Sequence, residues 1–239
     1  MGNDPFSVLG VSSSATEDEI KSAYRNLGRA HSFYDGMMTG TGAAGRRILK
    51  HIWRMTREDA LECQSKAFAA IPEGFAGKLL EIPVGTGVLS MPVFRTFPDA
   101  KIVCADCSEK MMSAAKRRAE EMSLRNVAFR QCDVGNLPFA DGEFDAVVSL
   151  NGFHAFPDKE AAYREIFRVL KPGGVFCGCF YVTGENAHTD RWIRAVYVRA
   201  GFFTPPFETP ESLRERLKRS YSSAEVGNVQ SIAYFQCVK

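Results

Sequence analysis

The chain lacks long apolar runs and lacks an excess of charge of either sign. Its 239 residues include 30 lysines and arginines against 28 aspartates and glutamates, for a formal net charge of +2. This balance gives no reason to expect a nucleic-acid partner. No apolar stretch approaches the roughly 20 residues that cross a bilayer, and the first residues lack a basic segment followed by an apolar run. We therefore expect a cytoplasmic protein without membrane insertion.

The chain also lacks a second C-x-x-C motif that could pair with the one at Cys104-Ala105-Asp106-Cys107. The seven cysteines are odd in number and spread along the chain, so neither a zinc site nor a disulfide framework is expected, and no metal site is predicted. Hydrophobic residues make up 45% of the sequence. At this length such a composition predicts one large domain, or a medium domain with a small attachment.

From about residue 77 onward, short apolar runs alternate with segments of helical period. The expected strands are 78–82, 102–105, 127–131, 144–150 and 175–182. The expected helices between them are 89–97, 109–122 and 159–170. Lys171-Pro172-Gly173-Gly174 would stop the last helix and form a tight turn. Strands and helices at this spacing predict a parallel sheet covered on both faces.

The last part of the chain changes character. Helices are expected at 190–200 and 211–219, and the runs 224–229 and 232–238 are close enough to form a hairpin. The fold class predicted is therefore α/β, a doubly wound and mostly parallel seven-stranded sheet with an antiparallel last strand. The first 60 residues contain no convincing strand and are expected to be helical.

Two glycine-rich runs compete as a nucleotide-binding turn. Gly40-Thr41-Gly42-Ala43-Ala44-Gly45 fits the G-x-G-x-x-G pattern but follows no strand, and it is interpreted as a loop between helices. Leu80-Glu81-Ile82-Pro83-Val84-Gly85-Thr86-Gly87 has a predicted strand before it and a predicted helix after it. That context brings free N–H groups to a ligand at the start of a helix. We expect the cofactor at the second run.

Several acidic residues lie at or near the ends of the predicted strands. The motifs are Glu81-x-x-x-Gly85-x-Gly87, Asp106 with Ser108 and Met111-Met112, Asp133-Val134-x-x-Leu137-Pro138-Phe139, Phe144-Asp145-x-Val147 and Arg168-Val169-Leu170-Lys171-Pro172-Gly173-Gly174. In order and spacing, residues 77–182 resemble a class I S-adenosylmethionine-dependent methyltransferase of the ubiquinone and menaquinone methylase group. The resemblance implies a Rossmann-like fold, S-adenosyl-L-methionine as cofactor and a small-molecule methyl acceptor.

The resemblance also implies roles for particular residues. Gly85 and Gly87 would border the methionine part of the cofactor, Glu81 and the backbone carbonyl of Asn151 would orient its ammonium, and Asp106 would take the ribose hydroxyls. The adenine would meet Asp133, Val134, Cys107 and Met111. The complete predicted cofactor set is Tyr34, Glu81, Pro83, Gly85, Thr86, Gly87, Asp106, Cys107, Met111, Asp133, Val134 and Asn151.

Each role has a plainer alternative. Asp106 and Asp133 could cap helices, Met111 could pack in the core, and Tyr34 could be ordinary packing rather than an aromatic cover. Pro83 stands where the family usually has its first glycine, which fixes φ near −65° and removes one N–H from the turn. We expect a working turn of altered local shape, because close approach to the ligand falls to the two glycines.

The sequence says less about the residues that would contact the methyl acceptor. His154 follows the fourth expected strand and is a candidate general base, or it orders a loop. Phe202, Phe203 and Phe207 could wall an apolar acceptor pocket or close the core. The run Asn151-Gly152-Phe153-His154 differs from the sequence that quinone methylases carry here, so the sequence allows a quinone acceptor but does not support one.

The front of the chain shows a second resemblance. Asp4-Pro5-Phe6 and the segment Thr16-x-x-Glu19-Ile20-Lys21 resemble the first two helices of a J-domain, and Thr16 with Glu19 makes a capping box. Lys21, Arg25 and Arg29 would share one basic face. A J-domain needs His-Pro-Asp next, whereas this chain has His31-Ser32-Phe33, which argues against an Hsp70-type partner.

The domain organisation predicted is a J-domain-like helical segment at 1–33, a helical cap at 34–76 and the cofactor-binding domain at 77–239. The expected activity is methyl transfer to a small, apolar or aromatic molecule. Two alternatives remain: a catalytically impaired, chaperone-linked interaction protein, and a nicotinamide-dependent oxidoreductase, which Glu81 and Asp133 disfavour.

Overall fold

The computed structural model describes residues 12, 14–19, 35, 36 and 38–239. The predicted capping box is present: the Thr16 N–H donates to Glu19 Oε2 at 2.8 Å, and the Glu19 N–H donates to Thr16 Oγ1 at 3.3 Å. Helical residues follow from Glu17. The predicted basic face at 21–29, the 31–33 run and Tyr34 lie outside the described residues.

Seven strands form one sheet in the order β3-β2-β1-β4-β5-β7-β6. The strands are β1 (Lys78–Glu81), β2 (Lys101–Asp106), β3 (Val127–Gln131), β4 (Phe144–Leu150), β5 (Leu170–Tyr181), β6 (Ser223–Val229) and β7 (Ile232–Val238). The first five pair in parallel, and β7 runs antiparallel to both β5 and β6. The predicted fold class is confirmed.

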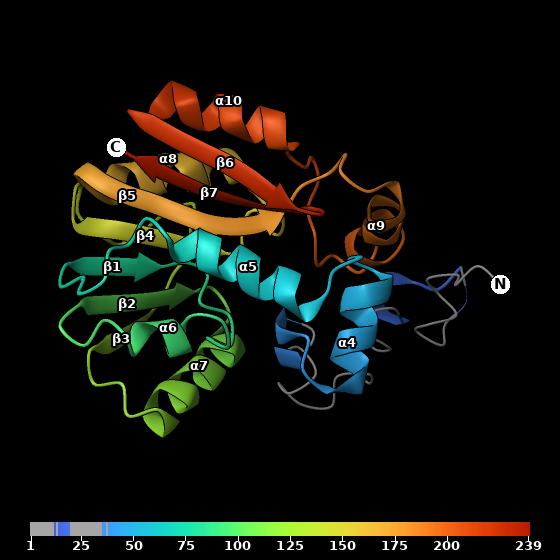
Figure 1. Cartoon of the computed structure of the whole chain (residues 1–239), viewed down its shortest axis with the longest axis horizontal. Helices are drawn as coiled ribbons and strands as arrows, with labels where there is room; N and C mark the ends of the chain where they lie inside the picture. The colour runs from blue at the N-terminus through green and yellow to red at the C-terminus, as the bar shows by residue number, and fades with distance from the viewer. Residues whose placement is uncertain (1–11, 13, 20–34, 37) are drawn as a thin grey trace.

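Helices cover both faces of this sheet (Figure 1). They are α4 (Gly42–His51), α5 (Arg57–Phe68), α6 (Met91–Phe94), α7 (Glu109–Glu121), α8 (Lys159–Val169), α9 (Ala187–Trp192), the π-helix η1 (Ile193–Val198) and α10 (Pro210–Ser220). The core of one face takes side chains from α8 and α10, and the core of the other takes them from α5, α6 and α7.

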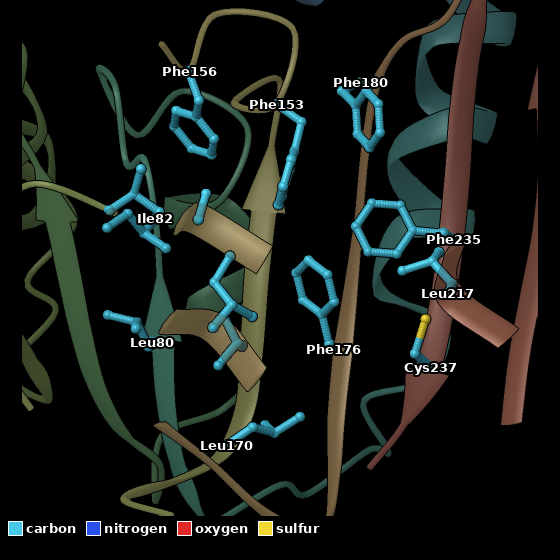
Figure 2. Close-up of a cluster of buried hydrophobic side chains, with 14 of the residues drawn as sticks. Leu80, Ile82, Phe153, Phe156, Leu170, Phe176, Phe180, Leu217, Phe235 and Cys237 are labelled. Atoms are coloured by element: carbon cyan, nitrogen blue, oxygen red, sulfur yellow. The ribbon is translucent and has the colours of Figure 1, made fainter. Parts of the chain in front are cut away.

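Successive side chains of each strand alternate between the two cores, one on each face of the sheet. In β1, Leu80 belongs to the α8 and α10 side and Leu79 to the other, because successive strand residues point to opposite faces. Figure 2 shows the first core, in which Phe176 of β5 and Phe235 of β7 lie between Leu80 and Leu217. Phe176 and Phe235 are fully buried, with ring centroids 4.8 Å apart.

A third cluster lies at one end of the sheet. It joins Leu49 and Trp53 at the end of α4 to Tyr181 at the end of β5 and to Ile193 and Tyr197 of η1. In Figure 1, the arrowheads of β1, β2 and β5 point toward the side of the molecule where α4 and α9 lie. The third cluster therefore adjoins the edge at which parallel α/β folds bind ligands.

Three elements differ from their predicted bounds by more than one residue at an end. The helix expected at 89–97 is reduced to α6. Pro92 lies in the first turn of this helix, where no N–H donor is needed, and so favours a start at Met91 rather than at residue 89. β5 begins at Leu170 rather than 175, since Leu170 pairs with Phe144 before a register shift. The helix expected at 190–200 is split into α9 and η1, and a π turn has no reliable sequence signature.

Among the described residues, none of the helices is both long enough and apolar enough to cross a membrane. The predicted division at residues 33 and 76 stays a prediction. Helix α5, which falls in the predicted cap, contributes Ala67 and Phe68 to one core of the sheet. Gln236 of β7 also donates its side-chain N–H to the carbonyl of Lys66 at 2.8 Å.

Candidate functional site

The ends of three neighbouring parallel strands bring polar groups to one edge of the sheet. β1 ends at Glu81, β2 ends at Asp106, and Asn151 follows the last residue of β4. Because β1 lies between β2 and β4 in the sheet, these three ends are adjacent. The strand-end acids predicted from the sequence therefore meet at one edge.

The turn after β1 is built around two glycines with positive φ, 55° at Gly85 and 68° at Gly87. A Cβ at Gly87 would lie 2.8 Å from Met91 Cγ, so any side chain there would force a shift. The Val84 N–H donates to the carbonyl of Ala105 at 2.8 Å, which ties the turn to the end of β2. Pro83 precedes this anchor and leaves both glycines free to take their conformations.

Asp106 fastens the same turn from β2. Its Oδ2 accepts from the Gly85 N–H and its Oδ1 from the Ser108 N–H, both at 2.8 Å. The side chain is buried, and this desolvation raises the pKa of the carboxyl group above its usual value, against the lowering effect of the backbone N–H groups. Each carboxylate oxygen still has acceptor capacity for a ligand hydroxyl.

Glu81 is the most deeply buried acid of the group, with 1% of its surface exposed. Its Oε2 accepts a weak hydrogen bond from Cys104 Sγ at 3.6 Å. Desolvation raises the pKa of this carboxyl group to about 8, and the nearby Asp106 charge adds to the effect. A buried acid of this kind is suited to receive a cationic group.

These residues line one pocket, which encloses about 360 Å³ of space including its open mouth. The lining residues are Met38, Glu81, Pro83, Val84, Gly85, Thr86, Gly87, Val88, Leu89, Ser90, Leu150 and Asn151. Glu81, Pro83, Gly85, Thr86, Gly87 and Asn151 of the predicted set are thus brought together. Asp106 reaches the pocket through its hydrogen bond to Gly85.

Comparison with known proteins identifies this arrangement. A methyltransferase domain family matches residues 79–174. A demethylmenaquinone methyltransferase of Thermus thermophilus is 42% identical over 97 residues, which are 41% of this chain and 44% of that protein. A ubiquinone/menaquinone biosynthesis C-methyltransferase of Desulfotalea psychrophila is 34% identical over 108 residues, 45% of this chain and 42% of that protein. Residues 79–174 are therefore similar to the class I S-adenosylmethionine-dependent methyltransferases.

A solved structure supports the same fold. Phosphoethanolamine N-methyltransferase 2 of Haemonchus contortus, in complex with phosphomonomethylethanolamine and S-adenosylhomocysteine, has a TM-score of 0.64 at 16% identity, over 88% of this chain and 61% of that one. The chain spans less than half the length of the two curated relatives. The matches favour a methyltransferase over both alternatives considered from the sequence.

The chemistry of the pocket fits S-adenosylmethionine. Glu81 offers a buried carboxylate for the ammonium, Gly85 and Gly87 hold the positive φ of the turn, and Asp106 has acceptor capacity for ribose hydroxyls. Within the described residues, no group of His, Cys, Asp and Glu side chains could hold a metal ion.

The residues predicted to meet adenine lie along the ends of β2 and β3. Val134 is buried, Met111 of α7 is half-buried, and Cys107 and Asp133 are exposed. Asp133 Oδ1 accepts from the Gly135 N–H at 2.9 Å, which orders the loop and leaves its other oxygen for a ligand amine. The placement suits adenine contacts, and their roles remain predictions.

Two contributors at the glycine turn were missed by sequence reasoning. Asp35 accepts from the Thr86 hydroxyl at 2.6 Å and pairs with Arg118 of α7 at 2.5 Å. Asp35 directly follows Tyr34 of the predicted cofactor set, and this two-residue run is a short signal. Arg118 has no signal, since an arginine on a charged helix is normally solvated.

The competing glycine run lies elsewhere. Gly42 begins α4 and Gly45 lies within that helix, so the loop predicted at 40–45 is correct only for its first residues. A Cβ at Gly45 would fall 2.0 Å from the carbonyl oxygen of Gly36, so the two backbones are in close contact. Glycine at this position serves chain packing.

His154 follows β4 and is buried, with 7% of its surface exposed. Its Nδ1 accepts from the Tyr181 N–H at 3.1 Å, and its ring stacks on Phe203 with centroids 3.8 Å apart. Burial lowers the pKa of the ring to about 3, with a smaller effect from Lys159. A neutral ring whose Nδ1 lone pair is engaged has its proton on Nε2. This geometry favours the ordering role over the general-base role.

Replacement of His154 by glutamine should therefore change stability more than turnover. The folded ring resists protonation until about pH 3, whereas the unfolded ring takes a proton near pH 6.5, so acidification favours unfolding. The wild type should lose roughly 1 kcal/mol of unfolding free energy per pH unit below pH 6 through this group, and the variant should not. Urea unfolding between pH 7 and 5 measures the difference. Parallel pH profiles, or a hundredfold loss of kcat, would favour the base role.

Proposed function

We propose that this methyltransferase transfers the methyl group of S-adenosylmethionine to a small, apolar and aromatic acceptor of the hydroquinone type. The observation that carries the cofactor assignment is the buried Glu81 carboxylate beside the glycine turn. Within the described residues, the surroundings that shift its pKa include no lysine or arginine. The ammonium of a bound cofactor would supply the missing positive charge.

The chain's part in the reaction is alignment. Bound S-adenosylmethionine supplies a methyl group on a sulfonium centre, from which it leaves by in-line displacement. Glu81 and the Asn151 carbonyl would orient the amino-acid end, and Asp106 would fix the ribose. Such fixation places the acceptor atom opposite the sulfur and excludes water, which is where most of the rate gain is expected.

The third cluster is rich in aromatic residues. Trp53, Tyr181, Tyr197 and Phe203 pack with ring centroids 5.0 to 6.3 Å apart, beside the ends of β4 and β5. Phe203 is only 8% exposed, so it closes the core rather than forming an open pocket wall. The names of the curated relatives point to quinones, and we extend that class to this chain as part of the proposal.

A transfer assay tests the proposal. The protein is incubated with methyl-labelled S-adenosylmethionine and, separately, a 1,4-naphthohydroquinone with a free ring carbon, a catechol and a primary amine. Label should pass into the extracted hydroquinone, and Asp106→Ala should abolish it. Label in the amine alone would overturn the acceptor class, and label in no acceptor despite cofactor binding would do the same.

A further inference from the structure

Asp35 lies outside the matched domain, yet it is bound to two parts of it. The Thr86 hydroxyl donates to Asp35 Oδ1 at 2.6 Å, and Arg118 Nη2 donates to Asp35 Oδ2 at 2.5 Å. Arg118 Nη1 in turn donates to the backbone carbonyl of Thr86. The three residues close a triangle in which each contacts the other two.

The triangle holds the glycine turn at its centre. Thr86 stands between Gly85 and Gly87 and is 1% exposed, and both its hydroxyl and its carbonyl are engaged. The side chains of Asp35 and Arg118 are 14% and 24% exposed, so the pair is shielded from solvent more than a surface ion pair. Charge-assisted hydrogen bonds in such surroundings are stronger than exposed ones.

The same segment carries a residue into the pocket. We define the N-terminal strap as Asp35, Gly36, Met38 and Thr39. Met38 lines the pocket beside Glu81 and Asn151, and the Asn151 side-chain N–H approaches Met38 Sδ at 3.6 Å. The Thr39 hydroxyl donates to the Asp35 carbonyl at 2.7 Å, which fixes the strap on itself.

We infer that Asp35 and Arg118 are positioning residues that hold the glycine turn and Met38 around the methionine end of the cofactor. The inference rests on the proposed function. It predicts selectivity, because the strap adjoins Glu81 and Asn151 rather than the residues expected to meet adenine. Loss of the Asp35–Arg118 pair should weaken the binding of ligands that carry the amino-acid end. The binding of 5′-methylthioadenosine, which lacks that end, should not change.

Calorimetric titration of Asp35→Asn with both ligands tests this. We expect S-adenosylhomocysteine to bind about ten- to a hundredfold more weakly, and 5′-methylthioadenosine to change by less than about threefold. Asp99→Asn removes an exposed loop carboxylate and should leave both unchanged. Arg118→Gln should reproduce the selective loss, whereas Arg117→Gln, exposed on the same helix, should not.

The double variant Asp35→Asn/Arg118→Gln should bind S-adenosylhomocysteine no more weakly than the weaker-binding of the two single variants, because both substitutions remove the same interaction. An unchanged affinity of Asp35→Asn and Arg118→Gln for S-adenosylhomocysteine would overturn the inference. Equal weakening of the binding of both ligands, together with a lowered Tm, would show that the Asp35–Arg118 pair only stabilises the fold, and would also overturn the inference. A wild type that binds neither ligand would instead refute the proposed function on which it rests.

Discussion

Replacing Asp106 by alanine should weaken S-adenosylhomocysteine binding by about a hundred- to a thousandfold. The variant loses the acceptor expected to take both ribose hydroxyls, and hydrogen bonds to a charged group contribute about 1.5 to 3 kcal/mol each. It also leaves the Gly85 and Ser108 N–H groups without their present acceptor, so the glycine turn loses its link to β2. Isothermal titration calorimetry at neutral pH measures the affinity.

The control for this prediction is Asp99→Ala, which removes an exposed carboxylate from the loop before β2. It should bind as the wild type does. The affinity of Asp106→Asn should fall between those of the wild type and Asp106→Ala, since the amide oxygen can still accept one backbone hydrogen bond. An affinity of Asp106→Ala within about threefold of the wild type would show that Asp106 only orders the loop.

Cofactor binding should release close to one proton at pH 7. The Glu81 carboxyl group has a pKa of about 8 before binding, so it is mostly protonated at neutral pH. An ammonium placed beside it favours the ionised form and drives the proton off. Affinity should therefore rise nearly tenfold per pH unit between pH 6 and 7.5 and level off near pH 8. Titrations in buffers of different ionisation enthalpy count the proton.

Glu81→Gln provides the matched variant. It should bind S-adenosylhomocysteine at least tenfold more weakly, release no proton, and show no rise in affinity with pH. Because the folded pKa is raised, ionisation of the unfolded chain costs the wild type stability as pH rises from about 4.5 toward 8. The variant escapes this cost and should be more stable, by up to about 3 kcal/mol at pH 7. A wild type that binds without proton release would contradict the assignment of Glu81.

Much of the sheet was predictable because its strands carry local signals. The bounds 127–131, 144–150 and 232–238 were predicted as observed, since each run is β-rich and bordered by turn residues. Helix α6 and the start of β5 were not, because Pro92 and the pairing of Leu170 with Phe144 act against the local pattern. The π turn at Ile193–Val198 likewise carries no local marker.

For the site, strand-end residues were predictable and long-range partners were not. Glu81, Asp106 and Asn151 follow from the rule that parallel strands present their carboxyl ends at one edge. The pairing of Asp35 with Arg118 spans 83 positions, and nothing in either local sequence specifies it. The burial of His154 depended on Phe203 and on the Tyr181 N–H, neither of which is adjacent in sequence.

The central claim is that the pocket beside Glu81 and the glycine turn binds S-adenosylmethionine. Calorimetric titration of the wild-type chain with S-adenosylhomocysteine and, separately, with NADH tests it most directly. We predict saturable binding of one S-adenosylhomocysteine per chain and no binding of NADH. Saturable NADH binding that S-adenosylhomocysteine fails to displace, or no heat with S-adenosylhomocysteine at all, would contradict the claim.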